Sequence, residues 1–190
     1  MIQKFQISRD TQALFITITS KDRLTVFKSD AMKTILCGAI NEARTSGGFL
    51  IFSYVIMPDH LHLITNEPKS SADVLRYLKG ISARRVIDYL KEGGYESSLT
   101  KLRHEDWGRD HRYSLWQQEK NVFSIFSEKV FMQKVNYIHL NPVRAGFVER
   151  AVDYHWSSAR IWQRCELEEE PLLMDIDRIQ WRRGRSPRLD

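Results

Sequence analysis

The hydrophobic residues of this chain follow two periodicities, and the shorter period predicts several strands. Residues 13–20, ALFITITS, alternate between apolar and polar positions, which is typical of a half-buried strand. Residues 49–57 and 60–65 are apolar runs on either side of the turn sequence MPD, so we expect two further strands, antiparallel to each other. Residues 113–126 offer more strand material.

Apolar residues at helical spacing predict three helices. The first covers about residues 30–44, the second residues 69–94 and the third residues 127–140. Serine, a residue type preferred at N-caps, stands at or just before the start of each. Pro142 follows the third helix and is expected to end it, because proline lacks the backbone N–H that a helix needs.

The order of these elements predicts the fold class. A β-α-β-β-α-β series with a further helix is typical of an α+β, ferredoxin-like sandwich with a central antiparallel sheet. We expect helices on one face of the sheet, with the other face free for a ligand or partner. The polar residues 95–112 predict a loop or insertion. The domain is predicted to span residues 1–164, and the charged residues 165–190 are expected to form a flexible tail.

Composition narrows the class of protein. The 190 residues are 42% hydrophobic, enough for an ordinary core, and no stretch is long and apolar enough to span a membrane. Two cysteines far apart, Cys37 and Cys165, favour a reduced, intracellular protein without disulfides. The net charge of +5 is moderate and tilts the interpretation toward a polyanionic partner such as nucleic acid.

Two histidines interrupt the third apolar run. His60 and His62 are two positions apart, so in a strand they project from the same face, roughly 7 Å apart at ~3.3 Å per residue. Two imidazoles on one face can hold a divalent ion, although a pair alone binds weakly and needs a third ligand. A histidine pair in a strand can also be purely structural.

The third predicted helix carries two further candidates. Tyr137 lies off the apolar stripe of this helix, and Asn141 lies one turn later on the same flank. Asn141 could supply the missing ligand and Tyr137 a nucleophile, although Pro142 disfavours helical backbone at Asn141. His139 is the alternative ligand, but it lies about 160° from Asn141 around the helix. A single helical tyrosine is otherwise an ordinary core or surface residue.

At this point the sequence resembles a known family. MPDHLHLI, followed by NYIHLNPVRAGFVERAVDYHWSSA, resembles the single-tyrosine HUH transposases, and in particular the REP-associated tyrosine transposases, over roughly residues 10–160. The resemblance implies that Tyr137 attacks DNA and that His60, His62 and Asn141 bind Mg²⁺ or Mn²⁺. The family more often has glutamine where this chain has Asn141, and asparagine matches the REP-associated branch.

The resemblance also implies a reaction and partners. It implies a metal-dependent endonuclease and transposase that cleaves and rejoins single-stranded, hairpin-forming repeat DNA through a 5′-phosphotyrosine. It further implies a bacterial cytoplasmic, nucleoid-associated protein with no membrane partner and no small-molecule cofactor. We expect a monomer, with a homodimer as the alternative.

Basic and aromatic residues outside this site are candidates for contacts with DNA. Trp107 and Trp116 offer stacking surfaces for single-stranded DNA. The candidate phosphate contacts are Lys79, Arg84, Arg85, Lys101, Arg103, Arg109, Arg112 and Arg144. Each of these cations can equally be a solvated surface charge.

Two other functions stay open from the residues alone. The chain could be a DNA-binding regulator on the same fold that performs no strand transfer. It could also be a metal hydrolase of small phosphoesters, which would not need Tyr137.

Overall fold

One four-stranded antiparallel sheet organises the molecule. The structure is a computed structural model that describes residues 4–104, 113–119, 121–165 and 167–181. Its strands are β1 (Ala13–Thr19), β2 (Ile51–Ile56), β3 (His60–Asn66) and β4 (Asn121–Ile125). They lie in the order β2-β3-β1-β4, and each neighbouring pair is antiparallel. The predicted α+β sandwich of ferredoxin-like type is therefore confirmed.

The helices begin where the serines predict them to begin. The longer ones are α1 (Asp30–Gly47), α2 (Ser71–Glu92) and α4 (Glu128–Arg144), and the shorter ones are α3 (Glu96–Leu102) and α5 (Ala159–Trp162). Ser29, Ser70 and Ser127 are the N-caps of the three longer helices, and each side chain accepts a hydrogen bond from the backbone N–H three residues later. Among the residues described, no helix has the length and apolar character needed to cross a bilayer.

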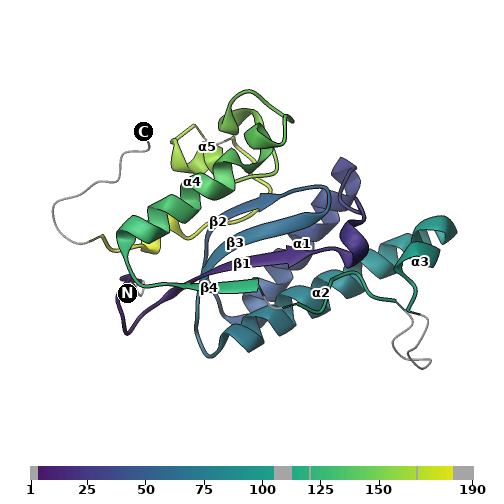
Figure 1. Ribbon diagram of the computed structural model, residues 1–190, viewed down its shortest axis with the longest axis horizontal. Helices are drawn as coiled ribbons and strands as arrows, with labels where there is room; N and C mark the ends of the chain where they lie inside the picture. Colours follow the sequence, from purple (N-terminus) through teal and green to yellow (C-terminus); the bar gives the residue numbers. More distant parts are fainter. Residues whose placement is uncertain (1–3, 105–112, 120, 166, 182–190) are drawn as a thin grey trace.

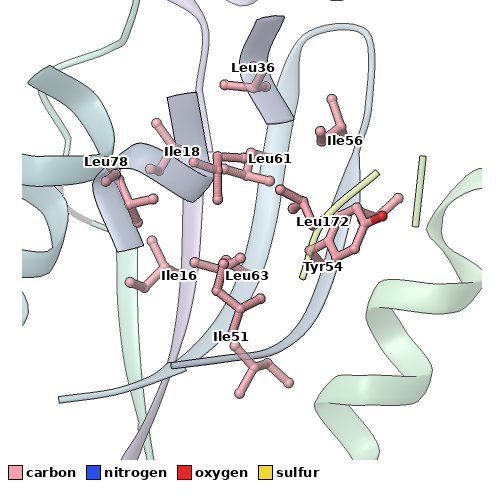
Figure 2. Packing of buried hydrophobic residues seen from close by; sticks show 14 of the residues in the cluster. Ile16, Ile18, Leu36, Ile51, Tyr54, Ile56, Leu61, Leu63, Leu78 and Leu172 are labelled. Atoms are coloured by element: carbon pink, nitrogen blue, oxygen red, sulfur yellow. The ribbon is translucent and has the colours of Figure 1, made fainter. Parts of the chain in front are cut away.

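The sheet has helices on both faces, in contrast to the prediction of one free face. Figure 1 shows α1 and α2 on one side of the sheet and α4 on the other. On the first side the core includes Ile16, Leu61 and Leu63, which pack with Leu36 of α1 and Leu78 of α2 (Figure 2). On the second side α4 contacts β2 and β3. The more open part of this second face therefore lies toward β1 and the edge strand β4.

Two predicted boundaries are wrong for local reasons. Within the predicted loop, α3 forms because Leu99 and Leu102, three residues apart, turn the same way and are buried. Helix α4 continues through Pro142 to Arg144. Proline removes only its own N–H donor, and the next turn is still closed by the N–H of Ala145, which donates to the carbonyl of Asn141.

Residues 167–181 differ from the expected flexible tail. Leu172 and Ile179 are buried in the core cluster. Asp175 is also buried, and its carboxylate accepts hydrogen bonds from the backbone N–H of Ile51 at 2.9 Å and from the guanidinium of Arg44 at 2.6 Å. Residues 167–181 therefore return to the sheet and contribute to the core.

Candidate functional site

The register of β3 places both histidines on the α4 side of the sheet. His60 pairs with Thr19 and His62 with Thr17 across the β1–β3 ladder. The two imidazole centroids are 4.7 Å apart, with their planes at 70°. The structure therefore brings the two predicted ligands together as ring neighbours, while the intervening Leu61 points to the opposite side of the sheet (Figure 2).

Each imidazole is oriented by a hydrogen bond at Nδ1. Nδ1 of His60 lies 2.6 Å from the carboxylate of Asp59, and Nδ1 of His62 lies 2.9 Å from the hydroxyl of Thr17. An ionised carboxylate only accepts, so Nδ1 of His60 carries the proton and Nε2 keeps its lone pair. The Thr17 hydroxyl can accept from Nδ1–H of His62 in the same way. This is the arrangement by which outer partners orient histidines that bind metals.

The electrostatics of the pair favour a neutral His62 and an ionised Asp59. Burial, together with the nearby His60 and Lys134, lowers the pKa of His62 to about 3. Partial burial raises the pKa of Asp59, but its hydrogen bonds with His60 and Arg23 more than offset this and keep it below its usual value. A neutral imidazole is the form that binds a cation, so near pH 7 no proton competes for His62.

Tyr137 of helix α4 lies next to the histidine pair of strand β3. Its ring centroid is 5.4 Å from that of His62 and 5.9 Å from that of Phe15, which itself stacks on His62. The Tyr137 side chain is 40% exposed, whereas His62 is buried. The phenol can therefore meet a large substrate from solvent while its ring edge contacts the histidine.

Two cations flank the tyrosine ring. The ammonium of Lys134, one turn earlier on α4, is 5.8 Å from the ring centroid, and the guanidinium of Arg144 is 5.4 Å from it. Positive charge on both sides favours a negatively charged group near the hydroxyl, such as a phosphate. Of the predicted phosphate contacts that the structure describes, Arg144 is the one that lies against Tyr137.

The two candidates for a third ligand are now distinguished. His139 is buried in the core, where Nε2 lies 2.9 Å from the hydroxyl of Ser158 and 3.3 Å from that of Ser53. Burial lowers its pKa to about 3. Asn141 is only partly buried and lies one helical turn after Tyr137, in helical backbone that Pro142 does not break.

The donor set fits a divalent cation. Within the ranges that the structure covers, no group of three His, Cys, Asp or Glu side chains could hold a metal ion. Among the described residues, the amide oxygen of Asn141 is the candidate for a third protein ligand. Two imidazole nitrogens and an amide oxygen suit Mn²⁺, or Mg²⁺ completed by phosphate oxygens and waters.

Most of the other predicted DNA contacts lie away from this site or have different partners. Lys79, Arg84 and Arg85 belong to α2, on the opposite face of the sheet. The ammonium of Lys79 donates to two backbone carbonyls of residues 117–119, and Arg85 forms a two-pronged ion pair with Glu42. Arg84 is exposed.

Of the cations in the predicted insertion, the structure describes Lys101 and Arg103, and it shows no contact between either of them and the histidines. Lys101 and Arg103 are exposed, and their backbone carbonyls accept hydrogen bonds from Lys21. Arg109 and Arg112 lie outside the described residues. The insertion therefore supplies no side chain that the structure places at the Tyr137 site.

The interpretation of Trp116 as a stacking surface for DNA is wrong. The indole is only 6% exposed, stacks on Phe27 and donates a hydrogen bond to the hydroxyl of Ser82 at 2.9 Å. Trp107 lies outside the described residues. Trp116 belongs to the core on the α1–α2 side.

Sequence reasoning missed three residues of the site. Asp59 directly precedes β3, which begins at His60, so strand alternation does not predict where its side chain points. Thr17 could have been found from strand pairing, because it is opposite His62. Lys134 could have been found from its place three residues before Tyr137, on the same side of the helix.

Comparisons with known proteins agree with this geometry. The family model described as "Transposase IS200 like" matches residues 10–141, more than half of the chain, and this range contains both histidines, Tyr137 and Asn141. An Escherichia coli K12 REP-associated tyrosine transposase is 23% identical over 147 residues, which cover 76% of this chain and 74% of the relative. A Haemophilus influenzae protein, provisionally named a REP-associated tyrosine transposase, is 26% identical over 156 residues, covering 77% of this chain and 83% of the relative.

A solved structure shares the fold. It is described as a REP-associated tyrosine transposase bound to a REP hairpin, and it matches with a TM-score of 0.60 and 20% identity over 87% of each chain. At this identity the match establishes the architecture of sheet and helices. Together with the family match across the site, it leads to one conclusion: the chain belongs to the IS200-like transposases, and within them it resembles the REP-associated tyrosine transposases.

Proposed function

We propose that this chain cleaves and rejoins single-stranded DNA through a 5′-phosphotyrosine on Tyr137, in a metal-dependent reaction on hairpin-forming repeat DNA. The observation that carries the proposal is the convergence of Tyr137 and the two histidines. The tyrosine ring lies 5.4 Å from the ring of His62, which lies 4.7 Å from the ring of His60. These residues come from two elements that the fold brings together.

His60, His62 and Asn141 are the residues that would hold the cation. A bound Mg²⁺ or Mn²⁺ would supply positive charge at the scissile phosphate. The protein's own contribution is to fix the imidazoles beforehand, through Asp59 at 2.6 Å and Thr17 at 2.9 Å. Rings held in this way need little rearrangement when the cation and DNA arrive.

Tyr137 carries the covalent chemistry. Its hydroxyl loses a proton and its oxygen bonds to phosphorus, while the bond to the 3′ oxygen breaks and that oxygen leaves as a free 3′-OH. The positive charges of Lys134 and Arg144, at 5.8 Å and 5.4 Å from the ring, favour binding of the negatively charged phosphate beside Tyr137. Because the phosphotyrosine keeps a phosphodiester, a second 3′-OH can attack it, rejoin the DNA and release Tyr137.

The named relatives support the choice of substrate, and the fold supports the choice of assembly. Two relatives are named as REP-associated tyrosine transposases, and a protein of this name has been solved with a REP hairpin. We extend hairpin DNA to this chain on that basis. Both halves of the site come from one chain, which supports a monomer as the acting unit.

The test is a search for a covalent protein–DNA adduct. The full chain is incubated with Mn²⁺ and labelled single-stranded hairpins taken from repeats near its own gene, and the products are separated on a denaturing gel. We expect an adduct that disappears in Tyr137→Phe and persists in Tyr95→Phe. Tyr95 is a suitable control because it is similarly exposed, at 46% against 40%, and belongs to the α2–α3 junction.

Two results would contradict the proposal. Cleavage that survives Tyr137→Phe would point to a hydrolase that uses water. Tight binding of every hairpin without any adduct would point to a DNA-binding regulator.

A further inference from the structure

The edge strand β4 carries an exposed aromatic ring beside the proposed nucleophile. Phe123 lies in the middle of β4 and is 49% exposed. It is directly opposite Phe15 on β1, so the two side chains share a face of the sheet. Phe15 stacks on His62 and contacts the Tyr137 ring, at centroid distances of 5.3 and 5.9 Å. The face that carries the histidines therefore continues outward to Phe123.

Lys134 joins this ring to the site. Its ammonium lies 4.8 Å from the centroid of Phe123, 4.6 Å from that of Phe15 and 5.8 Å from that of Tyr137. The side chain is partly buried, and across the described ranges it forms no ion pair with a carboxylate. Among the described residues no carboxylate therefore neutralises this cation, and its charge can attract an incoming anion.

Packing uses only part of the Phe123 ring, which is 49% exposed. Its ring is half exposed on an edge strand, a position where proteins more often place charged residues to prevent association. Trp116, by comparison, is satisfied by the core. An exposed ring next to a cation is instead the combination with which proteins bind single-stranded nucleic acid, because the ring stacks on a base and the cation contacts a phosphate.

We infer that Phe123 and Lys134 form a binding site for one unpaired nucleotide beside Tyr137. The base stacks on the exposed part of the Phe123 ring, and the phosphate of the same stretch of backbone pairs with the Lys134 ammonium. The inference rests on the proposed function, which it deepens by giving the single strand a path across the open edge of the sheet. At this edge of the sheet, Phe123 would contact the flat face of an unpaired base, and any of the four bases could bind there.

Two probes separate stacking from phosphate contact. One is a fluorescent oligothymidylate of about 12 nucleotides, within the usual range of single-strand site sizes. The other is an oligomer of the same length made of abasic nucleotides, which keeps the phosphates and has no bases. Affinities are measured by anisotropy with the full chain over a series of salt concentrations.

The expected results differ between the two side chains. Phe123→Ala should weaken binding of oligothymidylate about 5- to 150-fold, the usual effect of losing one stacked base, and leave binding of the abasic oligomer unchanged. Phe123→Trp should restore the lost affinity. Lys134→Gln should weaken both probes and reduce the slope of log K against log salt by about 0.7. Phe126→Ala is the matched control, because Phe126 is 50% exposed and lies just beyond β4.

The inference is overturned if Phe123→Ala affects both probes equally or neither, if Phe126→Ala has the same effect as Phe123→Ala, or if the wild-type chain binds no oligothymidylate. The adduct assay is scored separately. Adduct formation with unchanged oligothymidylate binding in Phe123→Ala would refute only the proposed nucleotide-binding site. A base-dependent effect of Phe123→Ala without any adduct would support the nucleotide-binding site and refute the proposed strand-transfer reaction.

Discussion

The hydrogen bond from His60 to Asp59 allows a direct test of the proposed metal site. The carboxylate lies 2.6 Å from Nδ1 of His60 and 3.0 Å from the guanidinium of Arg23, which holds it in place. In the wild type, the Asp59 carboxylate keeps the proton of His60 on Nδ1, so that the lone pair of Nε2 is free to bind a cation. Asp59→Ala removes this acceptor. His62 keeps its own partner, Thr17, so the substitution loosens one of the two imidazoles.

The size of the effect can be estimated in two ways. A hydrogen bond to a charged group contributes about 1.5 to 3 kcal/mol, which corresponds to roughly a 10- to 150-fold change in affinity. Loss of an outer partner of a metal ligand commonly weakens metal binding about 10- to 100-fold. We therefore expect Asp59→Ala to weaken Mn²⁺ binding by about 10- to 100-fold. Asp59→Asn, which keeps an acceptor oxygen without the charge, should weaken Mn²⁺ binding by about 10-fold or less.

The measurement is a titration of the full chain with Mn²⁺, in which free Mn²⁺ is followed by electron paramagnetic resonance. The yield of Tyr137 adduct is then measured against Mn²⁺ concentration. A residue that only positions His60 should shift both midpoints to higher Mn²⁺ and leave the final adduct yield near that of the wild type. Glu42→Gln is the control, since it also breaks an ion pair with an arginine but lies on α1, on the far face of the sheet. Unchanged Mn²⁺ affinity in Asp59→Ala would refute the assignment of His60 as a ligand.

Three further predictions follow from the site and the core. His139 has a pKa lowered to about 3, while an unfolded histidine titrates near 6.5, so only the unfolded state takes up this proton between those values. The free energy of unfolding should therefore fall as pH falls through this window, by up to about 1.4 kcal/mol per unit from this residue, and urea unfolding of His139→Gln should lose that part of the slope. Trp116→Phe should lose about 1 to 2 kcal/mol of stability in urea with unchanged affinity for oligothymidylate, and weaker binding would restore its role in stacking. Arg144→Gln should reduce the salt slope of oligothymidylate binding by about 0.7, and Arg85→Gln should not change it.

The sheet and the three long helices could be predicted because their signals are local. Alternation in residues 13–20 and the serine caps of the helices are properties of a few adjacent residues. The short helix α3 has only one turn of buried contact, from Leu99 and Leu102, which is too little for a periodic signal. Trp116 was misassigned because composition alone cannot distinguish an aromatic residue of the core from one on the surface.

The course of residues 167–181 could not be predicted because it depends on distant partners. The tail was predicted from the acidic run at residues 166–170 and the basic stretch from residue 181, and the apolar residues between them have no clear period. The burial of Asp175 depends on the N–H of Ile51 at the start of β2 and on Arg44 of α1, both more than 120 residues away. Contacts over such separations leave no signal in the residues nearby.

The placement of each site residue within its own strand or helix was predictable, but the contact between strand and helix was not. Strand period placed His60 and His62 on one face, and helical period placed Tyr137 and Asn141 on one flank, but neither period says that these two surfaces meet. They meet because α4 crosses the face of the sheet that α1 and α2 leave open, as Figure 1 shows. The imidazoles are thereby fixed in a ladder of backbone hydrogen bonds, while the tyrosine stands 40% exposed on a helix. In the proposed reaction, the histidines that position the phosphate are held by the sheet. The tyrosine, which would carry the DNA strand and then release it, is accessible to solvent.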